Sequence, residues 1–517
     1  MAIWGRLAKS EVTIVAFGQI VQQILTLCTG IIIARSIGSD GYGLVNLQKA
    51  LFTAALLVAP LGLDLALLRY CGQHPMDAPQ TLATITSLRV ISLIVNTGML
   101  AFFVLFLGDF LEQSVFRHSE FAYLFIITMI ALPMAADLAI LGACYRVLER
   151  PGMYALMTIY LQSIVRVILV VIVIYFVPTV AAVVYINTIQ IVLSAGVVAV
   201  HYRRLAASVR RTDGGDAQVP ARRPWMSAQA WTNARKILGD SVFMAMNLFV
   251  YGVMRFLDIL MLGSMAAARD VGEYGAVSTI SQLIQVYPLA MSQTLGPRIA
   301  RLYHAGDIVG LRDALNRYIQ LATLVASFIF AGIAAFGTRL DLLFGASFSF
   351  HADVAFLVPL GYLLSATLAP TGYALSMTGR HRSELVILVV GAACLIGLGL
   401  LLIPSHGQLG AAIAVAVSFG LVNIIRFMFV ARYFKFRPGR LLDLVPPVLG
   451  LAIAFGAREL VALAMERSLV STIVGCVIYA AVYGTIVWLC LLPPGMRAAL
   501  AASVMRRGAG QPMDPPD

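Results

Sequence analysis

Four basic side chains lie within or at the end of long apolar runs, where an ionised group is costly and is therefore a functional candidate. They are Arg35, Lys49, Arg166 and Arg255. At ~1.5 Å of rise per residue, Arg255 lies ~22 Å and Arg166 ~20 Å from the inner end of its run, and Lys49 ~9 Å below the outer end. A guanidinium matches phosphate oxygens with a planar fork of donors, and Lys supplies a point charge. We therefore expect these cations to line a cavity that binds an anionic group.

Other polar side chains in the apolar runs add two further roles. Amides could hydrogen-bond a polar ligand, and carboxylates could titrate or bind a coupling cation. The amide candidates are Gln19, Gln22 and Gln23, and the carboxylate candidates are Asp64, Asp137 and Asp258.

Structural interpretations compete with each of these roles. Arg255 and Asp258 are three residues apart on one helix face, as in a self-contained ion pair. Helix–helix packing pairs are the alternative for Lys49 and Arg166, and neutralisation of Arg69 or Arg146 is the alternative for Asp64 and Asp137. Arg89 and Arg426 lie nearer the inner boundary, where long side chains snorkel, and are not counted as ligands.

The elements that position these residues are membrane-spanning helices. The chain has 517 residues, of which 60% are hydrophobic and only 12% charged, whereas about a quarter of a soluble domain is charged. Its mean hydropathy is +0.88. Apolar runs long enough to cross a bilayer predict an all-α polytopic protein with about 14 spans. The spans are expected near 12–34, 43–68, 82–107, 121–145, 153–176, 180–202, 240–264, 272–297, 314–337, 352–378, 383–403, 408–431, 443–464 and 468–492.

The basic residues orient this bundle. Of the 37 Lys and Arg residues, 26 fall on one side of the predicted spans and six on the other. The positive-inside rule therefore places both termini in the cytoplasm. The net charge of +12 reflects topology and not nucleic-acid binding.

An internal repeat relates the two halves. An offset of 232 residues superimposes Tyr42-Gly43 on Tyr274-Gly275 and Arg69 on Arg301. Each copy holds six spans, an even number, so the copies insert the same way up. Parallel repeats of this kind are related by a pseudo-two-fold axis along the membrane normal. We read Tyr42-Gly43 as a tight turn in which glycine adopts positive φ and tyrosine anchors at the interface.

This repeat organises the chain into successive parts. A Gly-, Pro- and Arg-containing segment near the middle reads as a linker, and the last residues look disordered. The predicted parts are an N-lobe at 1–202, a basic cytoplasmic linker at 203–236, a C-lobe at 237–433, two additional spans at 434–492 and a cytoplasmic tail at 493–517.

Several short motifs resemble those of the polysaccharide-repeat-unit flippases, in the multidrug/oligosaccharidyl-lipid/polysaccharide exporter superfamily. The resemblance covers roughly residues 10–440. It rests on Ala34-Arg35, Gly38 and Tyr42-Gly43, on DLLFG at 341–345, on GR at 379–380 and on LIPSHGQLGAAIAVAVS at 402–418.

The resemblance implies a protein of the bacterial inner membrane that moves a polyprenyl-diphosphate-linked oligosaccharide outward by alternating access, for exopolysaccharide or O-antigen synthesis. Its partners would be that substrate, membrane lipids, and polysaccharide polymerase and chain-length machinery, with no nucleic acid. The runner-up is a cation-coupled multidrug antiporter of the same superfamily.

An enzyme is not expected. The six cysteines are scattered without a CxxC pair, and no Walker A motif occurs. The sequence therefore predicts no catalytic residues, no metal site and no cofactor.

Overall fold

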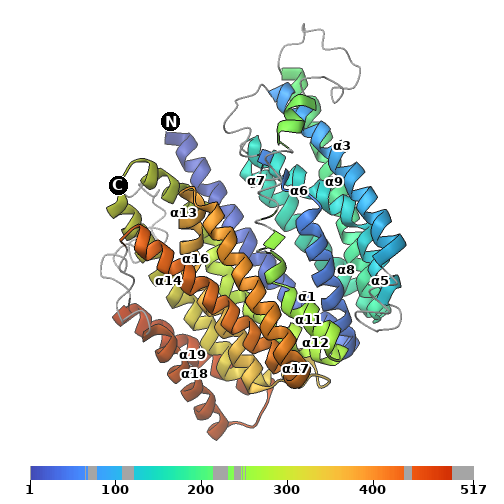
Figure 1. Cartoon of the computed structure of the whole chain (residues 1–517). Coiled ribbons are helices and arrows are strands. Elements are labelled where there is room, and N and C mark those ends of the chain that lie inside the picture. The colour runs from blue at the N-terminus through green and yellow to red at the C-terminus, as the bar shows by residue number, and fades with distance from the viewer. Residues whose placement is uncertain are drawn as a thin grey trace.

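The computed structural model describes residues 2–63, 66–67, 78–107, 121–148, 150–212, 231–237, 246, 249–250, 252–435 and 445–491. Within these ranges the regular secondary structure is all helical, without a strand. Figure 1 shows long helices packed roughly along one direction. The expected fold class, an all-α polytopic membrane protein, is confirmed.

The helices before residue 213 pack together and are called here the first bundle. They cluster around apolar cores that include Leu63, Leu141 and Tyr145 near one end and Phe125 and Leu132 further along. The elements are α1 (Ala2–Val58), α3 (Ala78–Phe102), the π-helix η1 (Phe103–Leu107), α5 (Phe121–Ile130), α6 (Leu132–Val147), α7 (Pro151–Tyr154), the π-helix η3 (Ala155–Tyr160), α8 (Leu161–Phe176) and α9 (Val180–Thr212).

The helices from residue 257 to 433 form the second bundle, and two more helices follow it. The second bundle comprises α11 (Leu257–Met265), α12 (Ala268–Ser281), η5 (Gln282–Gln285), α13 (Val286–His304), α14 (Ile308–Phe336), η6 (Gly337–Arg339), α15 (Asp341–Phe344), α16 (Ala352–Met377) and α17 (His381–Tyr433). The C-terminal pair consists of α18 (Val445–Ala464) and α19 (Leu469–Ile486), and the π-helix η8 (Val487–Leu491) follows α19.

Ten helices of the described residues are long and apolar enough to cross a membrane. Two of them each contain two predicted spans, because α1 has a non-helical residue at Gly38 and α17 at Gly407. Both glycines have positive φ, 74° and 52°, which glycine adopts without the steric penalty of a side chain. The Tyr42 hydroxyl lies beside Gly30, although twelve residues of straight helix would separate the two residues by about 18 Å. The chain therefore folds back at Gly38.

The other two predicted spans, 240–264 and 272–297, are not among the ten. Much of the first lies outside the described residues, and its described end is interrupted by a turn at Arg255 and Phe256 before α11 begins. In the second, every residue from Val271 to Ser281 is buried within the protein. Polar side chains such as Glu273 are tolerated in α12 because they face protein groups and not lipid.

The two bundles meet where α1 crosses α12. A side chain on Gly43 would collide with the carbonyl of Ala268, and one on Gly272 with the carbonyl of Ser39. Such close approach of backbones through small residues is typical of helix pairs in membranes. In Figure 1 the bundles converge at the bottom, near α11 and α12, and stand apart at the top, where the N-terminus lies.

The chain turns at a positive-φ glycine, as expected, but this glycine is Gly38 and not Gly43 of the Tyr-Gly pair, and the expected interfacial role of the tyrosine was wrong. Among residues 41–43 none has positive φ; Gly38 does. Tyr42 is 3% and Tyr274 0% exposed, so neither lies at a lipid–water interface. Gly43 allows α1 and α12 to approach closely. Because the contacting residues come from the other half of the chain, the local sequence around Gly43 does not reveal this role.

The C-terminal pair is fastened to α14. The Tyr479 hydroxyl donates to the Phe328 carbonyl at 2.8 Å, and the Tyr483 hydroxyl donates to the Leu324 carbonyl at 3.0 Å. The Tyr479 and Phe328 rings also stack with centroids 5.1 Å apart. The pair therefore belongs mechanically to the second bundle.

Candidate functional site

A cavity of about 510 Å³ lies inside the first bundle. Pockets for small ligands typically measure about 300–1,000 Å³, so this volume is large enough for a saccharide or a diphosphate group. Four helical segments line it, namely α1, the α5–α6 segment, the segment from α7 to α8, and α9. One wall includes the π-helix η3 through Thr158 and Ile159, and π-helical turns are frequent at functional sites.

Three cations line this cavity: Lys49 from α1, Arg146 from α6 and Arg166 from α8. None of the three takes part in an ion pair with any residue that the structure describes. The Nε atoms of Arg146 and Arg166 are buried without a hydrogen-bond partner in that same part of the chain. Because a buried donor without a partner is costly, the arrangement favours an incoming acceptor.

The three cations stand at two levels of the cavity. The Arg146 guanidinium lies over the Tyr154 ring, 4.9 Å from its centroid. Arg166 follows Tyr154 by twelve residues, which corresponds to about 18 Å along a helix. An anionic group can therefore meet a cation both near the inner end of α6 and deep in the bundle.

Amides and hydroxyls fill the walls between the cations. The Gln48 amide donates to the Phe121 carbonyl at 3.3 Å, while its buried oxygen has no partner in the described structure. The Thr188 hydroxyl donates to the Ile127 carbonyl at 3.1 Å. The remaining polar lining residues are Gln22, Thr53, Thr128, Tyr154, Thr158, Gln162, Asn187 and Gln190.

The structure brings together Lys49, Arg166 and Gln22 from the residues singled out in the sequence. Gln19 and Gln23 are not among the lining residues, although the oxygen of Gln19 is buried without a described partner. Arg35 lies outside the cavity. Its guanidinium donates to the carbonyls of Leu342 and Leu343, at 2.6 and 2.7 Å.

Arg255 occupies a different place, beside a void of about 20 Å³ in the second bundle. This volume holds about one water molecule. The turn at Arg255 breaks the helix before Asp258, and the two residues form no ion pair. Instead, Asp258 accepts a hydrogen bond of 2.6 Å from the Tyr274 hydroxyl.

The other carboxylates and boundary cations are also placed by the structure. Asp137 accepts two hydrogen bonds of 2.6 Å from Arg89, so its partner among the described residues is Arg89 and not Arg146. Arg426 is only 6% exposed and pairs with Glu384, which replaces the expected snorkelling. Asp64 and Arg69 lie outside the described residues.

Sequence reasoning missed Arg146, because the predicted span 121–145 ends one residue before it. The residue belongs to the last turn of α6, and its side chain reaches the cavity beside Tyr154. Arg146 directly follows a buried stretch that ends at Tyr145 and lies four residues before Arg150, and this sequence context does not show which way its side chain points. Only the packing of α7 against α6 decides it.

Solved structures with this arrangement of helices are membrane transporters. The chain is similar to the lipid II flippase MurJ in an inward closed conformation, with a TM-score of 0.68, 11% identity, and coverage of 92% of this chain and 99% of that one. It is also similar to an inward-facing multidrug resistance transporter of the MATE family, with a TM-score of 0.61, 16% identity and coverage of 81% and 98%. At these identities the likeness establishes the fold alone, which the chain shares with these two transporters.

The family model for polysaccharide biosynthesis proteins matches residues 8–303, which is more than half of the chain. The chain belongs to this family, and the resemblance seen in its motifs is confirmed.

Two curated relatives match shorter parts of the chain. The probable low-salt glycan biosynthesis flippase Agl15 of Haloferax volcanii is 20% identical over 261 residues, covering 50% of this chain and 55% of that protein. The membrane protein EpsK of Bacillus subtilis is 28% identical over 182 residues, covering 34% and 35%. The chain thus spans about half the length of the first relative and about a third of the second.

Proposed function

We propose that this protein carries a polyprenyl-diphosphate-linked oligosaccharide from the cytoplasmic to the outer leaflet of the bacterial inner membrane, for exopolysaccharide or O-antigen synthesis. The observation that carries the proposal is the cavity in the first bundle, where Lys49, Arg146 and Arg166 have no described anionic partner. Membership of the polysaccharide biosynthesis family supports it.

The lining chemistry suits each part of such a substrate. An isolated phosphate charge is very unfavourable in the membrane interior, and guanidinium groups compensate it with charge-assisted hydrogen bonds. The amides and hydroxyls of the walls, such as Gln22 and Asn187, can exchange their bonds with water for bonds with sugar hydroxyls. The polyprenyl chain would remain in the lipid.

Closure of one side supports alternating access. The contacts between α1 and α12 lie on the side that the basic residues assign as outer, and Arg146 and Tyr154 lie toward the other end. In this conformation the cavity would receive its cargo from the cytoplasm, where both termini would lie. Polysaccharide polymerase and chain-length machinery would then act on the cargo at the outer face.

The rival function is a cation-coupled multidrug antiporter, because the chain shares its fold with MATE transporters. A cationic drug would meet three cations in the cavity, and like charges in a low-dielectric site repel strongly. Of the candidate coupling carboxylates, Asp137 is already paired with Arg89 and Asp258 with Tyr274. The cavity therefore favours anionic cargo.

The test is translocation by purified protein in proteoliposomes. The substrate is a polyprenyl-diphosphate tetrasaccharide with a fluorophore on the glycan, and a membrane-impermeant reductant reports its appearance in the outer leaflet. We expect Lys49→Gln and Arg166→Gln each to slow translocation by roughly ten- to a hundredfold, the effect of losing about 1.5–3 kcal/mol from a hydrogen bond to a charged group.

The matched control is Arg204→Gln, because Arg204 is an exposed arginine of α9 outside the cavity. It should translocate like the unmodified protein. Equal rates for all three variants would refute the cationic cavity. Transport of an organic cation instead of the glycan would establish the antiporter.

A further inference from the structure

We propose that the C-terminal helix pair controls the closure of the outer side, and that the short helix α15 transmits this control to the first bundle. The inference rests on the alternating access of the proposed function. It assigns a mechanical role to α18 and α19, which lie outside the internal repeat.

The first bundle holds α15 through Arg35. Its Nε donates to the Leu343 carbonyl at 2.7 Å and its second nitrogen to the Leu342 carbonyl at 2.6 Å. The last carbonyls of a helix have no partner within the helix and carry partial negative charge, so they suit a guanidinium. Gly345 ends α15 with φ of 112°, and the Arg35 stem lies against it.

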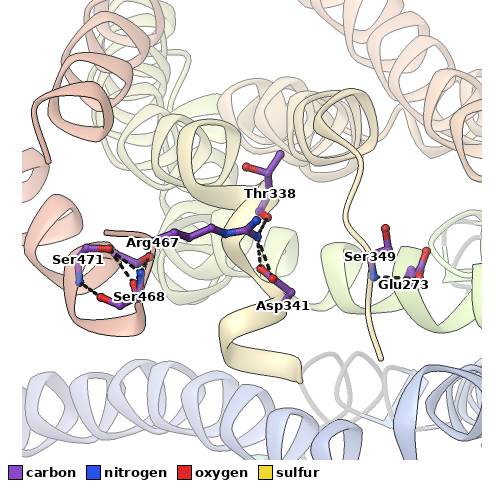
Figure 2. A network of polar contacts seen from close by, with 8 residues as sticks. Glu273, Thr338, Asp341, Ser349, Arg467, Ser468 and Ser471 are labelled. Carbon is purple, nitrogen blue, oxygen red and sulfur yellow. Dashed lines mark hydrogen bonds and ion pairs between the residues drawn. The ribbon is translucent and has the colours of Figure 1, made fainter. Parts of the chain in front are cut away.

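The C-terminal pair holds α15 at its other end through Arg467. Figure 2 shows this side chain reaching from the α18–α19 loop to Asp341 and Thr338. One guanidinium nitrogen donates to both carboxylate oxygens of Asp341 at 2.8 Å and to the Thr338 carbonyl at 3.1 Å. Asp341 is the first residue of α15.

Arg467 projects from a firmly built base. The next residue, Ser468, is the N-cap of α19 and forms a capping box with Ser471, in which each side chain satisfies a backbone donor of the other residue. Tyr479 and Tyr483 then bind α19 to carbonyls of α14. A shift of the C-terminal pair would therefore move Arg467 and pull on Asp341.

The surroundings of α15 form the surface on which the first bundle closes. The Tyr42 ring packs edge-on against Phe344 and Phe348, with centroids 6.1 and 5.9 Å away. Beyond them, Glu273 accepts from the backbone nitrogen of Ser349 at 3.0 Å (Figure 2) and from the Gln408 amide at 2.8 Å. Glu273 thereby ties the 345–351 connection to α12 and α17.

The helix itself cannot maintain its position, because α15 has four residues, about one turn. The α15 carbonyls face Arg35 only while contacts on either side hold the helix in place: Arg467 with Asp341 at its start, and Glu273 with Ser349 after its end. Opening the outer side must break both Arg35 hydrogen bonds and remove Tyr42 from its two phenylalanine neighbours. Loosening Arg467 from Asp341 would lower the stability of the closed state without touching the first bundle.

The experiment measures the outer separation of the bundles in reconstituted protein without substrate. Spin labels are placed at Pro178→Cys in the first bundle and His406→Cys in the second, both exposed, after the six native cysteines are replaced by serine. Pulsed electron–electron resonance then gives the fraction of molecules with a long outer distance. Because no substrate is added, the readout does not depend on which cargo is carried.

We expect Arg35→Gln to raise the ratio of open to closed molecules roughly three- to tenfold, since its bonds are charge-assisted but solvent-exposed. Arg467→Gln should raise it roughly two- to fivefold, because this pair is more weakly held: the Arg467 and Asp341 side chains are 57% and 28% exposed. The double variant should raise the ratio more than either single variant does, but less than the product of the two single fold-changes. Such non-additivity indicates that the two contacts act on the same closure.

Controls separate coupling from general damage. Glu466→Gln in the same loop and Asp353→Asn at the start of α16 change exposed carboxylates without described partners and should leave the ratio unchanged. Exchanging the charges in the double variant Asp341→Arg, Arg467→Asp should restore the ratio in part, because a carboxylate at position 467 pairs with the new arginine but cannot donate to the Thr338 carbonyl. If Arg467→Gln fails to fold, Asp341→Asn tests the same ion pair from its other side.

Two results would overturn the inference. A ratio that is unaltered by Arg467→Gln and by Asp341→Asn, while Arg35→Gln raises it, would show that the C-terminal pair does not act on the closure. An unaltered ratio in all variants would show that α15 is not part of the closure. Neither result bears on glycan transport, which the proteoliposome assay tests separately.

Discussion

Arg426 and Glu384 form an ion pair in the interior of the second bundle, with side chains 7% and 9% exposed. Asn423 lies within 3.5 Å of the same guanidinium. Removing one partner of such a pair leaves the other charge buried alone, which costs about 3–5 kcal/mol. We expect Glu384→Gln to lower the thermal stability of the detergent-solubilised protein strongly, as measured by thermal unfolding.

The double variant Glu384→Gln, Arg426→Gln should recover much of that loss, because no unpaired charge remains. Glu466→Gln, on an exposed carboxylate, serves as the control and should unfold at the original temperature. Equal stability of the single Glu384→Gln variant and this control would show that the pair contributes nothing to the fold.

At the scale of single residues, the sequence predicts the depth of a site residue in the membrane but not its partners. Rise along a helix gives the depth of a side chain but not the direction in which it points. The depths calculated for Lys49 and Arg166 fall at levels where both residues line the cavity. Arg35, at the outer end of its predicted span, instead donates to the Leu343 carbonyl, which is 308 residues away in sequence. Partners so remote cannot be inferred from local pattern.

At the scale of elements, the crossing of α1 and α12 depends on the absence of a side chain at Gly43. Because a methyl group there would overlap the backbone carbonyl of Ala268, we expect Gly43→Ala to hinder closure of the outer side. The open fraction between labels at Pro178→Cys and His406→Cys should rise at least as much as in Arg35→Gln.

Gly98→Ala is the matched control, because Gly98 also lies within a helix, α3, and a side chain there meets nothing within 4 Å. Both changes raise intrinsic helix propensity by about 1 kcal/mol, so any difference between them reflects the crossing. An open fraction that is the same in Gly43→Ala and Gly98→Ala would contradict the role given to this contact.

Elements were predictable where one physical requirement dominates. Long apolar runs must form helices in lipid, so α3, α8, α9 and α14 follow directly from the sequence. The same requirement fails for α12, which protein surrounds, and it says nothing about the break at Arg255. Those features depend on packing between segments that are distant in the chain.

For the whole molecule, the closed outer side and the cationic cavity belong to one conformation. The cavity lies in the first bundle alone, whereas the outer contacts join both bundles. Binding and closure are therefore built from different residues, so a change in one can leave the other intact. The substrate would connect them by binding the two conformations with different affinities.

The sidedness of this conformation can be measured with a cysteine at the cavity residue Gln162. In membrane vesicles, we expect Gln162→Cys to react with a membrane-impermeant maleimide roughly tenfold faster when the cytoplasmic side faces outward, because the outer contacts exclude water from the other side. Pro178→Cys, exposed between α8 and α9, should show the opposite preference and thereby fixes the orientation. Equal reactivity of Gln162→Cys from both sides, with Pro178→Cys behaving as expected, would show that the outer side is not closed in the membrane.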